Sequence, residues 1–319
     1  MLQRIQVDGK VFSNIPGSAG RMLPGYDSPV DHPYRPELLS TYQFRQDEFR
    51  MVNFWWVREN SRVDGSRRLG LMLMGPKGCG KTTLPEQYLT RLGVPVASYT
   101  SKKHTLLDDL IGTKTVIGGD IVRVDGPLLL AMKGGFPFIH NEVDIMDPGE
   151  LAGLNDIVER GLLILDDGTV IRAARGFAYV CTLNTRGSGD VDGSYAGAQV
   201  MNKAFMRRFL KMSVSYPTED EETALICEVF PTVKPNEAAL FAKAAALIRK
   251  AYMGNDPNVP TIEETISTPE LLTWVEVSGA FRGVRPDTVH FGLEATLTAV
   301  CEGVTKKTIA EIVQRVFNV

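Results

Sequence analysis

Cysteine is scarce in this sequence. The 319 residues include four cysteines, which lie far apart and form no CxxC pair: Cys79, Cys181, Cys227 and Cys301. This spacing argues against a disulfide framework and against a structural zinc site. We expect the four thiols to be small, buried or half-buried side chains.

Long apolar runs are absent as well. The sequence contains no stretch of about 18 consecutive apolar residues, so we expect no membrane span. Its first residues, MLQRIQVDGKVF, lack the apolar core of a signal peptide. These two absences predict a cytoplasmic protein.

Neither sign of charge dominates. Lys and Arg number 35 against 38 Asp and Glu, a net charge of -3, which argues against nucleic acid as the main partner. Hydrophobic residues make up 44% and charged residues 23%, as in ordinary globular proteins and unlike disordered chains, coiled coils or collagen. A chain of this length accommodates about two domains.

The order of patterns along the chain suggests three segments. Residues 1–46 are rich in Gly and Pro and predict an extended arm with one short strand over 5–12. Residues 47–215 alternate helical and buried-strand patterns, which predicts a parallel α/β sheet covered on both faces. Residues 216–319 have a helical composition and predict a smaller second domain. Within the middle segment we expect helices over 47–56 and 81–92, and strands over 69–74, 94–100, 136–142 and 178–184.

Two hairpins interrupt this alternation. Residues 113–124 place two β-rich arms around Gly118-Gly119, and residues 162–172 place arms around Asp167-Gly168. Both dipeptides are typical of two-residue turns between antiparallel strands.

A glycine-rich loop gives the strongest functional signal. It lies between an expected strand and an expected helix and fits GxxxxGK[ST] at each fixed position, which predicts a nucleotide site. The loop residues that we expect to contact the nucleotide are Gly75, Pro76, Lys77, Gly78, Cys79, Gly80, Lys81, Thr82 and Thr83. In such loops the lysine reaches the β- and γ-phosphates and the hydroxyl binds magnesium. ATP and Mg²⁺ are therefore the expected ligands.

A polar cluster follows the strand at 136–142. Glu142 is placed to polarise a water molecule for attack on the γ-phosphate, but Asn141 stands where an Asp that orients magnesium is usual. The candidate metal ligands are thus Thr82 and Asn141, with Asp144 as a compensating carboxylate. The missing Asp leaves an inactive nucleotide-binding relic as the alternative. Asn184, at the end of another strand, is a candidate for orienting the attacking water, or is simply a turn residue.

These motifs, in this order, resemble those of AAA+ ATPases. The loop, Glu142, Asn184 and a later Arg208-Phe209 occur in that family's sequence order, and the two hairpins resemble those of its MoxR-type branch. Within that branch the chain resembles CobS-like subunits of aerobic cobaltochelatase. The matching stretches are Leu107-Asp-Asp-Leu-Ile-Gly112, 184–195 continuing to Arg208, and parts of the arm near 10–12, 23–26 and 42–44.

The resemblance implies a fold and a set of roles. The fold is a P-loop AAA+ three-layer sandwich with a parallel sheet, two β-hairpin inserts and a small C-terminal α-helical lid. Glu142 would be the catalytic base, Asn184 the first sensor, and Arg208 the arginine finger that acts on a neighbouring subunit. Arg207 is the second candidate for the finger, and ordinary surface ion pairs are the alternative for both arginines. A finger acting in trans implies a ring, and the family implies a homo-hexamer.

Three functions stay open at this point. The first is an ATPase ring that remodels a partner, typically a protein with a von Willebrand A domain. The second is the ATPase subunit of a cobalt or magnesium chelatase. The third is a nucleotide-gated structural or regulatory ring with slow or no hydrolysis. Asn141 favours the third, as does Pro269, which occupies the place of the family's second-sensor arginine. Arg282 and Arg285 are distant substitutes for that arginine. The Gly-rich stretch 187–197 is either a mobile loop near the ring interface or a flexible connection without a further role.

Overall fold

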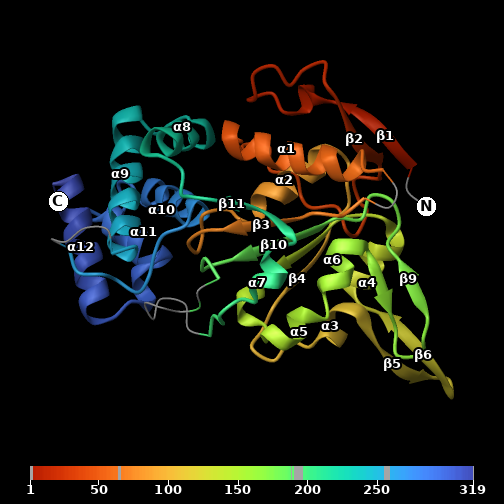
Figure 1. Ribbon diagram of the computed structural model, residues 1–319. Coiled ribbons are helices and arrows are strands. Elements are labelled where there is room, and N and C mark those ends of the chain that lie inside the picture. The colour runs from red at the N-terminus through yellow and green to blue at the C-terminus, as the bar shows by residue number, and fades with distance from the viewer. Residues whose placement is uncertain (1–2, 64–65, 188, 190–196, 255–258, 319) are drawn as a thin grey trace. The chain divides into compact units, whose positions relative to one another are not determined.

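The computed structural model describes residues 3–63, 66–187, 189, 197–254 and 259–318. These residues form two compact units (Figure 1). Unit 1 contains the chain up to Gly75 together with Gly80–Val214. Unit 2 contains Pro76–Cys79 together with the chain from Ser215 onward.

A parallel sheet forms the centre of unit 1. Its described strands follow the order β11–β3–β10–β7–β4. Their bounds are β11 (Phe209–Ser213), β3 (Gly70–Met74), β10 (Tyr179–Leu183), β7 (Phe138–Asn141) and β4 (Ala97–Thr100). The register pairs Leu183 with Met74 and Thr100 with Asn141. Because parallel strands end at the same edge, this register brings together the loops that carry the predicted polar residues.

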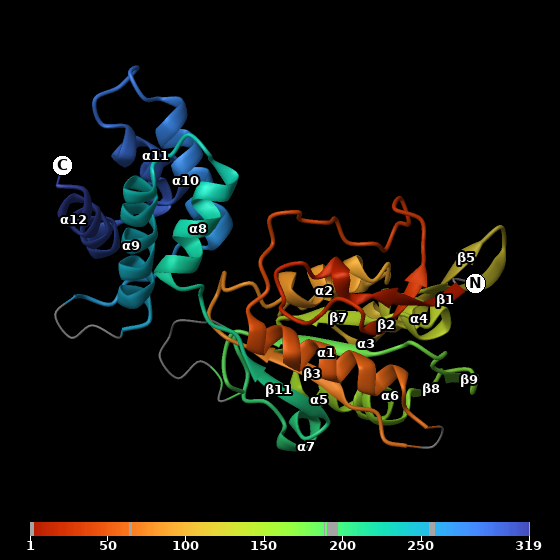
Figure 2. The same cartoon turned by 90° about the horizontal axis from the view of Figure 1, so that it is seen from above.

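Helices cover both faces of this sheet, which explains why strands such as GLMLM are apolar throughout. The helices α1 (Gln46–Asn60) and α2 (Thr83–Arg91) lie on one face (Figures 1 and 2). The other face carries α4 (Pro127–Gly134) and α6 (Asn155–Arg160), whose apolar side chains share one core with β7 and β10. Short segments on that side are α3 (Leu107–Ile111), η2 (Val143–Ile145), α5 (Pro148–Ala152) and α7 (Lys203–Met206). The predicted three-layer sandwich is therefore confirmed.

Both predicted hairpins are present. In the first, β5 (Gly112–Ile117) pairs with β6 (Asp120–Asp125), and Gly118 and Gly119 form the two-residue turn with φ of 63° and 96°. In the second, β8 (Leu162–Ile164) pairs with β9 (Val170–Arg172). Its connection spans residues 165–169, so the predicted two-residue turn is wrong there. Leu165 donates its N–H to the Thr169 carbonyl at 2.9 Å, and Gly168, with φ of 81°, donates its N–H to the Leu165 carbonyl at 2.9 Å, which closes a longer hairpin loop with a left-handed glycine.

The N-terminal arm is more ordered than its composition suggests. The strand β1 (Gln3–Asp8) ends before a short helix η1 (Gly9–Val11), so the predicted strand over 5–12 is wrong at both ends. A second strand, β2 (Met22–Asp27), pairs with it and was missed because Pro24 and Gly25 hide the pattern. Gly25 is required there, since a Cβ would lie 2.4 Å from the Leu92 carbonyl oxygen. Trp56 fastens the arm by donating its indole N–H to the Pro24 carbonyl at 2.7 Å.

Unit 2 is helical. Its helices are α8 (Glu219–Val229), α9 (Pro235–Tyr252), α10 (Thr268–Ala280), α11 (Thr288–Thr296), η3 (Thr298–Val300) and α12 (Gly303–Phe317). A buried ion pair joins α9 to α8, with Arg249 Nη1 at 2.6 Å from Glu222 Oε2. Phe241, Trp274 and Phe317 pack edge to face where three helices meet. Across the described part of the chain, no helix is both long and apolar enough to traverse a bilayer.

Candidate nucleotide site

The glycine-rich loop connects β3 to α2. Gly78 and Gly80 have φ of 76° and 90°, a backbone conformation that side chains with a Cβ rarely adopt, so glycine is required at both positions. The helix α2 begins at Thr83, directly after Lys81 and Thr82. Within unit 2, the Tyr216 hydroxyl donates a hydrogen bond to the Lys77 carbonyl. The loop thus has the backbone shape that lets N–H groups surround a phosphate.

Lys81 joins the loop to the end of a neighbouring strand. Its Nζ donates to the Gly75 carbonyl and to Asn184 Oδ1, both at 2.9 Å, and the residue is 8% exposed. The structure thus brings together two predicted site residues that are 103 positions apart. Because Lys81 is held beside Asn184, a phosphate that binds the ammonium group also lies next to that amide.

The predicted metal ligands Thr82 and Asn141 also meet. The Thr82 hydroxyl donates to Asn141 Oδ1 at 2.7 Å, so both oxygens lie at one point of the site. Mg²⁺ prefers oxygen ligands and usually keeps several waters, so this pair fits the ion together with nucleotide phosphates. Both protein oxygens are neutral, however, which lowers the electrostatic attraction for the ion compared with a carboxylate.

Glu142 has an unusual backbone. Its φ of 54° and ψ of 45° place it in the left-handed region, which few residues with a Cβ adopt. The side chain is partly exposed, and the backbone N–H donates to Thr182 Oγ1 at 3.1 Å. Backbone strain of this kind concentrates at functional sites, where the surroundings fix it. The same Thr182 hydroxyl also donates to Asn141 Oδ1 at 3.3 Å.

Asp144 has contacts unlike those of an open metal ligand. It is fully buried, and its Oδ2 accepts from the N–H groups of Asn184 and Thr185 at 3.1 Å and from the Thr185 hydroxyl at 3.0 Å. Its Oδ1 is buried and has no hydrogen-bond partner within the described ranges. Asp144 therefore anchors the segment that carries Asn184, and it acts on the site through that residue.

His140, in β7, is fully buried and contacts hydroxyl groups on both sides of its strand. Its Nε2 lies 2.7 Å from Ser101 Oγ and its Nδ1 lies 2.6 Å from the Tyr179 hydroxyl. Burial lowers the pKa of His140 to about 3, so the ring is neutral at physiological pH. It therefore supports the strand that carries Asn141 and Glu142 without contributing charge.

The two arginine-finger candidates differ in their contacts. Arg208 is held within its own chain, with Nε at 2.9 Å from Glu159 Oε2. Glu159 also pairs with Arg67 at 3.3 Å. No motif in the sequence indicated that this carboxylate would contact the arginine-finger candidate. Arg207 is exposed, and its side chain lines an open pocket beside α7. An exposed arginine is free to reach a second molecule, whereas Arg208 must first leave Glu159.

The second-sensor position lies in unit 2. Pro269 occupies the first turn of α10, which follows the N-cap Ser267. The two distant substitutes have acidic partners of their own: Arg282 pairs with Glu237, and Arg285 Nε lies 3.2 Å from Asp287. Residues 188 and 190–196 of the predicted Gly-rich loop lie outside the described residues.

The sequence prediction missed the threonines that organise this site. Thr182 contacts both Asn141 and Glu142, and Thr185 contacts Asp144. One signal was available, since Thr182 is a hydroxyl residue within an otherwise apolar strand two positions before Asn184.

Comparisons with known proteins agree with this geometry. Residues 70–209 match the family described as AAA domain (dynein-related subfamily). Among solved structures, a RuvB mutant from Thermotoga maritima superposes with a TM-score of 0.54 at 14% identity, covering 82% of this chain and 73% of that one. The fold and the phosphate loop therefore define the class: this is a P-loop protein with an AAA+ fold.

Comparison with curated proteins adds a relative that is similar along the whole chain. The chain is 26% identical to the aerobic cobaltochelatase subunit CobS of a Sinorhizobium species, and the alignment covers 100% of this chain and 96% of that protein. An uncharacterized protein of Staphylococcus epidermidis is 31% identical over 50% of this chain and 60% of its own length. Midasin of Giardia intestinalis is 30% identical over 50% of this chain, which corresponds to 3% of midasin. The chain thus contains a segment that matches the AAA domain family, and along its whole length it is similar to CobS.

Proposed function

We propose that this protein binds Mg-ATP and hydrolyses it as a subunit of a homo-hexameric ring in the cytoplasm. The observation that carries the proposal is the pair of contacts from Lys81 to the Gly75 carbonyl and to Asn184. These contacts support the proposal because the Lys81 ammonium group, which would bind phosphate, lies beside the Asn184 amide, which would orient the attacking water. Glu142, at the end of the neighbouring strand β7, would accept a proton from that water.

Magnesium would be held by Thr82 and Asn141 together with the phosphates. When bound, the ion neutralises charge on the β- and γ-phosphates. The protein would supply the remaining groups, since Lys81 would bind phosphate and the backbone N–H groups from Lys77 to Thr83 would surround it. Because Asn141 carries no charge, we propose that magnesium binds weakly and that hydrolysis is slow.

An arginine from the next subunit would complete the site. Arg208 and Arg207 are the candidates, and a finger supplied in trans is worth on the order of 10³–10⁵ in rate in other nucleotide hydrolases. The contacts favour testing both, because Arg207 is exposed while Arg208 is paired with Glu159.

The proposed task is to remodel or activate a partner protein that carries a von Willebrand A domain. The hairpins support it, since β5–β6 exposes the cross-strand pair Val116 and Ile121 on its surface.

A second candidate is the ATPase subunit of a chelatase that inserts cobalt or magnesium as its substrate. It is favoured by the similarity to CobS along 96% of that protein's length. A nucleotide-gated ring without turnover is the third, favoured by Asn141 and Pro269.

The first experiment compares ATP turnover and nucleotide-dependent mass in wild type, Glu142→Gln and Asn141→Asp. We expect slow turnover in wild type, turnover lost in Glu142→Gln with ATP binding kept, and magnesium affinity and turnover raised in Asn141→Asp. Assembly with bound ATP but no wild-type turnover, and turnover gained only in Asn141→Asp, would contradict hydrolysis and support the nucleotide-gated ring.

A further inference from the structure

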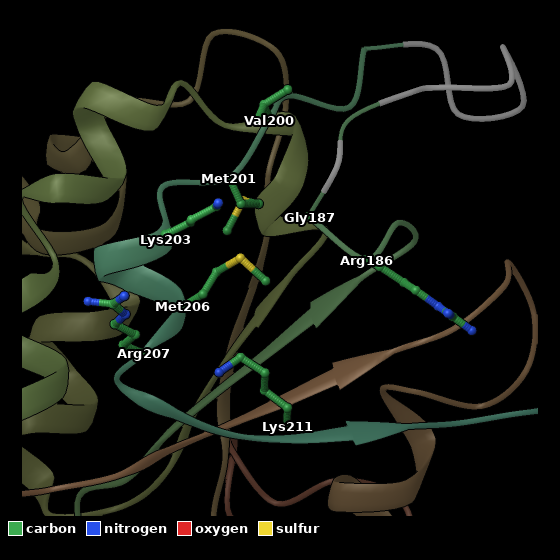
Figure 3. Close-up of a pocket in the computed structure, with 8 residues that line it drawn as sticks. All are labelled: Arg186, Gly187, Val200, Met201, Lys203, Met206, Arg207 and Lys211. Atoms are coloured by element: carbon green, nitrogen blue, oxygen red, sulfur yellow. The ribbon is translucent and has the colours of Figure 1, made fainter.

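A basic pocket lies beside α7 in unit 1. It has a volume of about 490 Å³, and its walls come from the segment after β10, from α7 and from β11. Figure 3 shows the side chains of Lys203, Arg207 and Lys211 gathered around Met206, with Arg186 extending away on the opposite side. Among the described residues, no acidic side chain lines it.

Three cations of this pocket have no acidic partner among the described residues. Lys203, Arg207 and Lys211 are exposed, and none forms an ion pair with a residue of the described ranges. Like charges that line one pocket repel one another, so an acidic partner that enters the pocket would relieve that repulsion. The apolar floor of Met201 and Met206 adds surface that such a partner would cover.

The chain itself carries the complementary charge, in its other unit. Residues 215–319 contain 15 Asp and Glu against 9 Lys and Arg, a net charge of -6, whereas residues 1–214 contain 23 against 26, a net charge of +3. The acidic charge is concentrated in the first turn of α8, where Glu219 and Asp220 are exposed. Neither of these two side chains forms an ion pair with a described residue.

We propose that the basic pocket of one copy binds the acidic first turn of α8 from a second copy. This inference rests on the proposed ring and names one of its contacts. The contact is heterologous, since the pocket and α8 are different surfaces, and heterologous contacts generate rings when the rotation closes. Charge pairs at such a contact fix the register between subunits and weaken as salt is added.

The test reverses each charge set separately and then mixes the two proteins. One variant carries Lys203→Glu and Lys211→Glu, and the other carries Glu219→Lys and Asp220→Lys, so neither changes a residue of the nucleotide site. Mass photometry with ATP measures the protein concentration at half assembly. We expect each variant by itself to need at least tenfold more protein than wild type, and the equimolar mixture to return to within threefold of wild type.

Rescue by mixing is the decisive result. In the mixture, the acidic pocket of the Lys203→Glu/Lys211→Glu variant can meet a basic α8 only on the Glu219→Lys/Asp220→Lys variant. Restoration in a chain that carries all four changes, without restoration in the mixture, would place the contact within one chain and overturn the proposal. Unchanged assembly of the Lys203→Glu/Lys211→Glu variant would assign the pocket to another anionic partner and overturn it too.

Two controls separate this contact from the nucleotide site and from misfolding. Lysine at the start of α8 opposes the helix dipole, so thermal unfolding is measured for each variant, and Glu219→Gln/Asp220→Asn should give a smaller assembly defect of the same direction. Binding of a fluorescent ATP analogue should be unchanged in all variants. A wild type that binds the analogue and stays monomeric would overturn the contact and leave nucleotide binding standing.

Discussion

At the scale of single residues, a buried carboxyl group positions part of the site. Asp144 receives three hydrogen bonds on Oδ2 and fixes the backbone of Asn184, whose side chain in turn accepts from Lys81. A hydrogen bond within a protein contributes about 0.5–1.5 kcal/mol net, and a buried polar group left without its partner costs more. The position of Asn184 is therefore set by a buried carboxyl group that lies outside the phosphate loop.

This arrangement leads to a prediction for Asp144→Asn. The amide keeps the shape of the side chain but weakens the three hydrogen bonds, so Asn184 should be less well placed. We expect kcat for ATP to fall about tenfold or more while KM and binding of an ATP analogue change less than threefold. Steady-state kinetics would measure this, with the exposed Asp156→Asn as the matched control. A variant whose KM alone changes would contradict the positioning role.

At the scale of elements, His140 ties neighbouring parts of the sheet together. It lies in β7 and contacts Ser101, which follows β4, and Tyr179 in β10. Both ring nitrogens are within hydrogen-bond distance of a hydroxyl, so one donates and the other accepts in the neutral ring. The strand that carries Asn141 and Glu142 is thus held from both sides by one side chain.

The buried ring predicts a loss of stability in mild acid. Burial lowers the pKa of His140 from 6.5 to about 3, so between these values the unfolded chain binds a proton that the folded chain does not. The free energy of unfolding therefore falls as the pH drops, by about 2 kcal/mol between pH 6.5 and pH 5 from this group. Urea unfolding at pH 7, 6 and 5 would measure it. His140→Gln should be less stable at pH 7 but should lose less on acidification. If wild type and His140→Gln lost equal free energy of unfolding on acidification, His140 would not be the group responsible.

At the scale of the whole molecule, bound nucleotide should stabilise the fold. A ligand that binds only the folded chain adds about 2.7 kcal/mol at a concentration one hundred times its Kd. We expect Mg-ATP to raise the melting temperature of wild type and to leave Lys81→Ala unchanged. Lys102→Ala, an exposed lysine outside the loop, should shift as wild type does. A shift retained in Lys81→Ala would mean that the nucleotide binds elsewhere.

The sequence located the elements better than it located their ends. Alternating apolar runs predicted the buried strands and both hairpins, because periodicity and Gly-Gly turns are local signals. The strand β2 was hidden by Pro24 and Gly25, which are tolerated only because the arm packs at an edge against Leu92 and Trp56. In the second hairpin, Gly168 adopts a left-handed backbone in a longer loop, and an Asp-Gly pair occurs in such loops as well as in two-residue turns.

By itself, the sequence determined the phosphate loop, since the left-handed backbone at Gly78 and Gly80 is a property of glycine and the lysine and threonine follow at fixed spacing. Only the tertiary structure decided which distant residues meet that loop. The contacts of Lys81 with Asn184, of Asp144 with Thr185, of Arg208 with Glu159, and the grouping of Lys203 with Lys211 depend on strand order and register. Register is fixed by the packing of the whole core, and no local pattern contains it.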